Sequence, residues 1–314
     1  MAIASALFNI IVFPGFLFLC LMGLIFEYVD RIIHARLQNR QGPPFFQPLA
    51  DFIKLTAKEE IIPDEADKKV FKFMPILALT AAATAFFYIP LWSVNSLYSF
   101  TGDVIVVLYL LTIPTVTFFL GGWSSTSMYA AIGAVRTLTQ LFSYEVLLFL
   151  GILSPMVLAD TWSLTDSAIY YNSHPALMLV NLAGFFISLI ALLGKLEKVP
   201  FDIAEAETEI VGGSFTEYSG RLLALFRMAI DVEMIVGASL IAAVFLPFGL
   251  MLNPVVAFAL YIVKVCFIVF LLSVFRTIFA RLRIDQMVKA CWKYFAPIAF
   301  AQILLVLIVK GVFL

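Results

Sequence analysis

The chain has 314 residues, of which 63% are hydrophobic and 13% are charged, with a formal net charge of −1 and a mean hydropathy of +1.03. A soluble domain usually carries about 25% charged residues, so this composition excludes an ordinary soluble protein and predicts an all-α, polytopic membrane protein. Cys20, Cys266 and Cys291 lie far apart and only two histidines accompany them. Because a zinc or iron–sulfur site needs about four such ligands, we expect no metal and no other cofactor in this chain.

Stretches long and apolar enough to span a bilayer, roughly 20 residues at 1.5 Å per residue, follow one another along the chain. They lie near residues 5–27, 71–92, 101–121, 134–158, 177–196, 228–249, 255–275 and 291–314. The first is too long for a cleavable signal peptide, and no basic residue precedes it. We therefore expect about eight transmembrane helices in a single integral membrane domain, 1–314.

The basic residues lie mainly in alternate connections between these stretches. The second, fourth and sixth connections contain no Lys or Arg, whereas the first, fifth and seventh contain several and the third contains Arg136. The positive-inside rule places such basic connections in the cytoplasm. We predict that loops 28–70 and 197–227 are cytoplasmic, that both termini lie outside, and that the membrane is the plasma membrane of a prokaryote.

The first connection is long and patterned. It reads as a basic, partly amphipathic helix, a Gly-Pro-Pro break at 42–44, and a second amphipathic helix with Leu49, Phe52, Ile53 and Leu55 on one side. Such helices lie along a membrane surface, and they serve either as lipid anchors or as a docking surface for a soluble partner. The candidate residues for partner contact here and in the third connection are Arg36, Arg40, Asp51, Lys54 and Arg136.

A run of acids occupies the fifth connection, between two apolar stretches. Its members are Asp202, Glu205, Glu207, Glu209 and Glu217. They are interleaved with apolar residues such as Ile203, which indicates partial burial. Crowded carboxylates at a low-dielectric boundary have raised pKa values and titrate as a coupled group. We interpret the run as the mouth of a proton path, with a solvated acidic loop as the alternative.

Four charged residues are expected within the apolar stretches themselves: Glu145, Asp231, Glu233 and Lys264. An ionisable group at membrane depth is by default a functional candidate, and a buried structural ion pair is the alternative. We expect the acids to form the inner section of the proton path. Lys264, near the middle of the seventh stretch, would need a carboxylate or water nearby and would link the path toward neighbouring subunits.

Four blocks in the same order carry a family resemblance: RLQNRQGPPFFQPLADFIKL (36–55), GGWSSTSMYAAIGAVRTLTQLFSYEV (121–146), PFDIAEAETEIVGGSFTEYSG (200–220) and RLRIDQMVKACWKYFAP (281–297). They resemble the complex I membrane subunit 1, or H, and its relatives in energy-converting membrane-bound hydrogenases and sulfur-reducing complexes. The resemblance implies eight helices that join a soluble redox arm to an ion-pumping arm, with loops 28–70 and 197–227 facing the redox arm.

One departure from the quinone-reducing members concerns the first connection. Only Pro44, Phe45 and Phe46 separate Pro43 from Gln47, where those members usually have a longer insert. This short segment resembles the hydrogenase-type branch. The implied partners are soluble iron–sulfur and hydrogenase-like large subunits, which carry iron–sulfur clusters with or without nickel–iron, together with antiporter-like membrane subunits. The lipid bilayer is a further expected partner, and no nucleic acid is expected.

The sequence contains no nucleophile–base set, phosphate loop or dinucleotide fingerprint after a strand, so we expect no catalytic centre in this chain. The expected function is a membrane anchor and coupling subunit of a multisubunit respiratory oxidoreductase. It would link ferredoxin-driven reduction of protons or a sulfur compound to proton or sodium translocation. The alternatives are a quinone-binding subunit, a purely structural anchor, and a stand-alone secondary transporter, which often shows two similar halves that are not seen here.

Overall fold

A computed structural model describes the backbone of residues 2–313 and the side chains of residues 7–206 and 208–312. All regular structure in this part of the chain is helical. Among the described residues, eight segments are long and apolar enough to cross a membrane. The prediction of an all-α, polytopic membrane protein is therefore confirmed.

The helices follow one another through short connections. In chain order they are α1 (Ala2–Ile11), α2 (Phe16–Leu37), α3 (Gln47–Ala57), α4 (Lys68–Phe86), α5 (Asp103–Ser124), α6 (Met128–Ala159), α7 (Leu164–Ser173), the 3₁₀ segment η1 (Pro175–Asn181), α8 (Leu182–Lys195), α9 (Glu207–Ile210), the 3₁₀ segment η2 (Gly213–Phe215), α10 (Gly220–Phe245), α11 (Pro254–Ile278), α12 (Ile284–Lys289), the π-helical segment η3 (Ala290–Phe295) and α13 (Ala296–Phe313).

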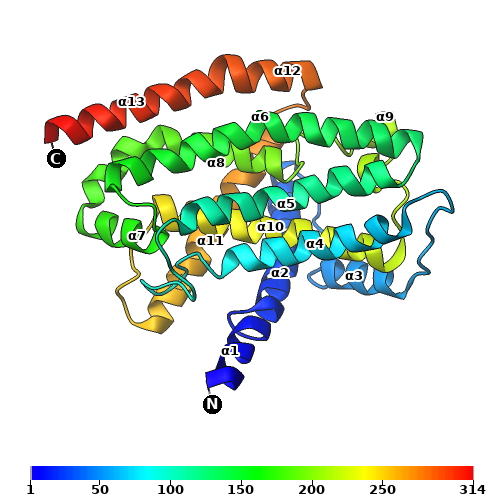
Figure 1. Cartoon of the computed structure of the whole chain (residues 1–314), viewed down its shortest axis with the longest axis horizontal. Coiled ribbons are helices and arrows are strands. Elements are labelled where there is room, and N and C mark those ends of the chain that lie inside the picture. The colour runs from blue at the N-terminus through cyan, green and yellow to red at the C-terminus, as the bar shows by residue number, and fades with distance from the viewer. Residues whose placement is uncertain (1, 314) are drawn as a thin grey trace.

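Helix α10 lies at the centre of the bundle, where every residue from Val232 to Phe245 is buried. A helix that is apolar on all sides is stable only when other helices surround it. Helices α4, α5, α6 and α8 run beside it, and α12 to α13 extend along the outer side of α6 (Figure 1). Small residues permit the close packing, because a Cβ atom on Gly237 would overlap with Leu192 Cδ1 on α8.

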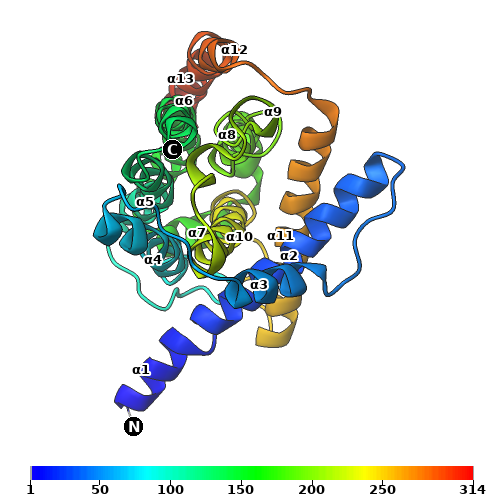
Figure 2. The ribbon, with the colours of Figure 1, turned by 90° about the vertical axis from the view of Figure 1, so that its right-hand side faces the viewer.

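Helices α2 and α11 cross this bundle at a steep angle, and α1 projects away from it (Figure 2). One end of the bundle carries α3, the α8–α10 connection and the α11–α12 connection (Figure 1, right). We call it the α3 end. Helix α3 packs on α2 and α10 through Pro48, Phe52 and Leu55, while Leu49 and Ile53 on the same helix remain exposed.

The first predicted stretch, 5–27, has other limits in the structure and is not one continuous helix. The stretch 5–27 is divided, because Pro14 lacks a backbone N–H and a Cβ atom on Gly15 would overlap with the carbonyl oxygen of Ile10. After this break α2 continues without interruption to Leu37. The basic segment after residue 30 is therefore the last part of α2 and not a separate interfacial helix.

The sixth helix also begins earlier than expected, at Gly220 instead of residue 228. Its first two turns bury Leu222 and Phe226 and expose Arg221 and Arg227. An amphipathic extension of this kind is too polar to register in a scan for continuous apolar residues, although its backbone is helical. The fifth connection therefore ends at Ser219, before the limit of 227 that the sequence suggested.

Candidate functional site

A cleft of about 650 Å³ opens at the α3 end between α2, α3, α10 and the segment that follows α8. Apolar side chains such as Leu24, Phe52 and Met228 form part of its wall. The rest of the wall is formed largely by acidic and basic side chains. These ionisable residues are Glu27, Arg31, Asp51, Lys54, Lys58, Glu197, Lys198, Asp202, Glu205, Arg227, Asp231, Arg276 and Arg281.

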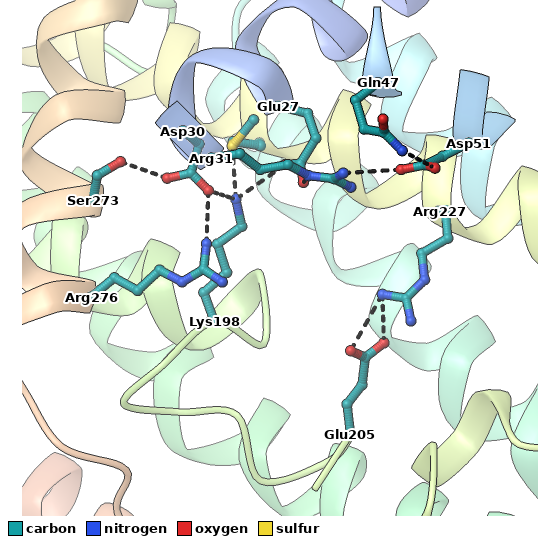
Figure 3. Close-up of polar contacts among 11 residues, drawn as sticks. Glu27, Asp30, Arg31, Gln47, Asp51, Lys198, Glu205, Arg227, Ser273 and Arg276 are labelled. Carbon is teal, nitrogen blue, oxygen red and sulfur yellow. Dashed lines mark hydrogen bonds and ion pairs between the residues drawn. The ribbon is translucent and has the colours of Figure 1, made fainter. Parts of the chain in front are cut away.

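Asp30 ties three elements together beside the cleft (Figure 3). Its buried carboxylate accepts hydrogen bonds from Lys198 Nζ at 2.7 Å, Arg276 Nη1 at 3.0 Å and Ser273 Oγ at 2.5 Å. Ser273 and Arg276 lie on one face of α11, and Lys198 belongs to the α8–α10 connection. We call these four residues the Asp30 cluster. It joins α2, α11 and the start of that connection through one carboxylate.

The charge of Lys198 is set by its surroundings in this cluster. Burial alone would lower the pKa of Lys198, but the carboxylates of Asp30 and Glu27 outweigh it and raise the pKa above its usual value. The distance from Lys198 Nζ to Glu27 Oε2 is 3.6 Å. Lys198 therefore stays protonated, and the connection that carries it is held electrostatically against α2.

Arg31, next to Asp30 on α2, connects α2 to α3 (Figure 3). Its Nε donates to Glu27 Oε1 at 2.7 Å and its Nη1 donates to Asp51 Oδ2 at 3.1 Å. Gln47 Nε2 donates to Asp51 Oδ1 at 2.9 Å. Asp51, which we predicted to contact a partner, is thus already engaged within the chain.

A second ionic cluster lies inside the bundle, where α6, α8 and α10 meet. Lys195 Nζ is 3.5 Å from Glu145 Oε2 and 3.5 Å from Glu233 Oε1. The side chains of Lys195 and Glu233 are fully buried, and the ammonium lies over the Tyr144 ring at 5.4 Å from its centroid. We call Glu145, Lys195 and Glu233 the Lys195 cluster. It brings together two of the acids expected within the membrane, through a lysine that sequence reasoning did not single out.

Glu197 follows Lys195 by two residues and belongs to the wall of the cleft. It is buried, and its Oε1 atom has no hydrogen-bond partner among the described residues. Burial raises the pKa of Glu197 well above its usual value, and the negative charges of Glu205, Glu233 and Asp202 raise it further. Its backbone has φ of 51°, a conformation uncommon for residues other than glycine. This carboxyl group therefore responds to charges in the cleft and in the Lys195 cluster.

Helix α6 fixes the position of the α8–α10 connection. Gln140 Nε2 donates to the carbonyl oxygens of Gly194 at 2.7 Å and Phe201 at 2.8 Å. Gly133 lies about two turns before Gln140 on α6. A Cβ atom added to Gly133 would lie 2.5 Å from the carbonyl carbon of Gly213. Gly213 itself has φ of +54°, which favours glycine. The connection thus rests directly on α6 and has little room to shift.

The structure corrects the expectation that the acidic run forms one crowded cluster. Asp202 and Glu205 do line the cleft, and Glu205 Oε1 is 3.0 Å from Arg227 Nη1. Glu209 instead points away, to Arg136 Nη1 at 2.6 Å and Arg281 Nη2 at 3.8 Å. The hydrogen bond and the charge of Arg136 lower the pKa of Glu209, opposite to the rise that crowding would cause. Asp231 also lines the cleft.

One further member of the run lies away from the cleft. Glu217 is half-buried and lies outside the residues that line the cleft. The side chain of Glu207 lies outside the described part of the structure. The physical reason for the dispersal is that the chain turns at the short α9, so that Glu205 before it and Glu209 within it meet different arginines.

Lys264 lies near the middle of α11, as expected. Its ammonium donates to the carbonyl oxygen of Phe248 and lies 4.4 Å from the centroid of the Phe248 ring. Phe248 lies in the α10–α11 connection, at the end of the bundle opposite α3 (Figure 1). A carbonyl oxygen and an aromatic face therefore surround the ammonium. The expected link from Lys264 toward neighbouring subunits stays a prediction.

The predicted docking residues divide into exposed and engaged side chains. Arg36 and Arg40 are exposed at and just beyond the end of α2, and Lys54 is exposed at the rim of the cleft. Arg136 and Asp51 are held by ion pairs within the chain. The exposed basic residues remain candidates for contact with another protein.

The site contains residues that sequence reasoning missed: Glu27, Asp30, Arg31, Lys195, Glu197, Lys198, Arg227 and Arg276. The sequence contained a usable signal for Glu27, Asp30 and Arg31. Their spacing of three and four residues puts them on neighbouring positions of one helix, once α2 is extended beyond the apolar stretch. The partners on α11 and in the α8–α10 connection carry no such local signal.

Comparison with known proteins agrees with this architecture. Residues 9–307 match the NADH dehydrogenase family. The chain is 33% identical over 297 residues to the H subunit of the NADH-quinone oxidoreductase of Carboxydothermus hydrogenoformans, covering 91% of this chain and 84% of the relative. It is 33% identical over 294 residues to NADH-quinone oxidoreductase subunit 8 of Thermus thermophilus, covering 90% and 80%.

A solved structure is similar over almost the whole fold. It is a chain of the membrane-bound sulfane sulfur reductase, an archaeal respiratory membrane complex, with a TM-score of 0.84 and 28% sequence identity over 93% of this chain and 96% of that one. The resemblance inferred from the four sequence blocks is thereby confirmed. The chain belongs to the NADH dehydrogenase family, together with subunit 1 of complex I, and is a multi-pass membrane subunit of a multisubunit respiratory oxidoreductase.

Proposed function

We propose that this chain couples electron transfer in a soluble redox module to ion translocation across the membrane, and that the cleft is where the redox module acts. The observation that carries the proposal is a succession of ionisable groups from the cleft into the bundle. It runs from Asp202 and Glu205 through Glu197 to the Lys195 cluster. The redox cofactors, iron–sulfur clusters with or without nickel–iron, would belong to soluble partner subunits.

The proposed mechanism is electrostatic. Charges in a low-dielectric interior interact strongly and titrate together, so a change at one site alters proton affinity at the next. A redox-linked change in charge or position at the cleft would act first on Glu197. Glu197 in turn interacts with Glu233, whose carboxylate lies beside the Lys195 ammonium. Antiporter-like membrane subunits would receive the effect and move the ion.

The proposed reaction of the complex is ferredoxin-driven reduction of protons or a sulfur compound. The short segment Pro44–Phe46 and the similarity to a chain of a sulfane sulfur reductase support this choice. In the same proposal the α3 end faces the cytoplasm and both termini face outside, because the exposed Arg36 and Arg40 belong to that end.

A quinone-binding role is the second candidate, and the names of the curated relatives favour it. Leu24, Phe52 and Met228 offer an apolar part of the cleft for a ring. A photoreactive quinone analogue distinguishes the two functions. We expect no labelling of residues 48–58 in the purified complex, and specific labelling that excess quinone prevents would establish the quinone role instead.

The coupling proposal is tested with Glu145→Gln and Glu233→Gln in the intact complex. Ion translocation per electron pair in membrane vesicles should fall sharply, whereas electron transfer in detergent, where no gradient opposes turnover, should be retained. Asp160→Asn is the matched control, because Asp160 is also paired with a lysine, Lys310 at 2.6 Å, but is largely exposed at the other end of the bundle. Normal translocation in both glutamine variants would contradict the proposal.

A further inference from the structure

A second cavity, of about 370 Å³, lies on the other side of α9 from the cleft. Its lining includes Arg136 from α6 and Arg281 and Arg283 from the α11–α12 connection. We call it the arginine cavity. Arg281 also lines the cleft, so its side chain borders both spaces.

The arginine cavity has an excess of positive charge. Its three guanidinium groups face two carboxylates, those of Glu209 and Asp285. Glu209 Oε2 lies 2.6 Å from Arg136 Nη1, and Glu209 Oε1 lies 3.8 Å from Arg281 Nη2. All three arginines act electrostatically on Glu209, whose pKa is lowered first by its hydrogen bond with Arg136. The glutamate thus occupies the place where an external anion would be most stable.

The surroundings place this cavity at the level of lipid headgroups. Trp292 and Tyr294 are exposed on η3, directly after α12, and Lys293 lies 5.7 Å from the Tyr294 ring centroid. Tyr129 is exposed at the start of α6. Exposed aromatic and basic side chains concentrate where a transmembrane helix passes through the headgroup layer. The apolar spans of α6 and α12 to α13 begin at this level.

We infer that the arginine cavity binds the phosphate of an anionic phospholipid headgroup through Arg136, Arg281 and Arg283, in competition with Glu209. Guanidinium groups bind phosphate oxygens in a bidentate manner, and basic pockets between transmembrane helices accept anionic headgroups. When the phosphate takes Arg136, α9 loses its ion pair with α6. Because Thr208 on α9 lines the cleft, occupancy of the cavity by lipid changes the wall of the cleft. Only this last consequence rests on the proposed coupling function.

The test measures binding to the intact complex after removal of its lipids in a neutral detergent. The probes are short-chain phosphatidylglycerol below its micelle concentration, short-chain phosphatidylcholine, and inorganic phosphate, each followed by equilibrium dialysis. Arg283→Gln should weaken phosphatidylglycerol binding about tenfold, since one charge-assisted hydrogen bond is lost. Glu209→Gln should strengthen the same binding, because the competing carboxylate is removed. Lys69→Gln, an exposed basic residue outside the cavity, should change nothing.

Arg283→Gln and Glu209→Gln are expected to change phosphatidylglycerol affinity in opposite directions. Misfolding cannot explain both results, because a damaged protein does not bind more tightly. Phosphatidylcholine or inorganic phosphate binding as tightly as phosphatidylglycerol would overturn the assignment to an anionic lipid. Loss of a soluble subunit from the Arg283→Gln complex, with lipid binding unchanged, would assign the cavity to an acidic protein segment instead. These binding results do not depend on ion translocation, so they stand or fall separately from the coupling function.

Discussion

The substitution Asp30→Asn should destabilise the fold far more than an equivalent change at the rim of the cleft. The Asp30 side chain is 2% exposed and its carboxylate faces two cations, Lys198 and Arg276. An amide at this position removes the carboxylate that pairs with Arg276 and leaves Lys198 with only the more distant carboxylate of Glu27, at 3.6 Å. Removal of one partner from a buried ion pair typically costs about 3–5 kcal/mol. The start of the α8–α10 connection should detach from α2 and α11 as a result.

The matched control is Asp51→Asn, which changes the same functional group at the rim of the cleft. The Asp51 side chain is 40% exposed, and the side chain of its partner Arg31 is 38% exposed. Exposed ion pairs contribute roughly 0.2–1 kcal/mol. At about 2 °C per kcal/mol for a large domain, the two variants should lower the melting temperature by roughly 6–10 °C and by no more than about 2 °C respectively.

Cys291 is buried in the folded chain, so its thiol supplies the assay in a background in which the partly exposed Cys20 and Cys266 are changed to Ala. A fluorogenic thiol reagent can follow the melting of each variant complex in detergent. Limited proteolysis of residues 197–206 gives an independent measure of the detached connection, and it should increase for Asp30→Asn alone. Equal melting temperatures and equal proteolysis for the two variants would show that Asp30 does not hold these elements together.

The remaining predictions concern pH, packing and topology. The folded state raises the pKa of Glu197 above its ordinary value of 4.5, by burial first and then by neighbouring carboxylates, so it retains a proton that the unfolded chain releases. The stability of the folded state should therefore decline as the pH rises from 4.5 through the folded pKa of Glu197. The substitution Glu197→Gln should remove this decline. The variant should melt at a higher temperature than the wild type near pH 8 and show no gain near pH 4. If the melting temperature of Glu197→Gln depends on pH in the same way as that of the wild type, this prediction is wrong. Gly133→Ala should cost about 1–3 kcal/mol by displacing Gly213, whereas Gly311→Ala, where no atom lies within 4 Å of the added carbon, should be neutral in the same thermal assay. Single cysteines at the exposed positions Asn95 and His174 should react with an impermeant thiol reagent from outside intact cells, and cysteines at Glu65 and Gln286 only after permeabilisation; the reverse pattern would invert the predicted orientation.

Two of the three residues of the Lys195 cluster were predictable because a charge in an apolar stretch is conspicuous. Glu145 and Glu233 stand out in this way, and the structure brings both to Lys195. Lys195 itself gave no such signal, since a basic residue at the end of an apolar stretch commonly marks the membrane boundary. Asp30 was overlooked for a related reason. It follows the first apolar stretch, where charged residues are usually solvated, and only the continuation of α2 to Leu37 buries it.

The membrane class, the number of spans and the family were readable from the chain because hydropathy and motif blocks are local properties of the sequence. The pairing of charges is not local. Lys198 and Asp30 are 168 positions apart, and Arg276 and Asp30 are 246 apart, so their contact depends on how steeply α2 and α11 cross the bundle. The same holds for the acidic run, whose members were expected to share one environment. Packing of α9 between two cavities gives Glu205 and Glu209 different arginine partners, because a side chain at a helix boundary takes its electrostatic environment from whichever elements pack beside it.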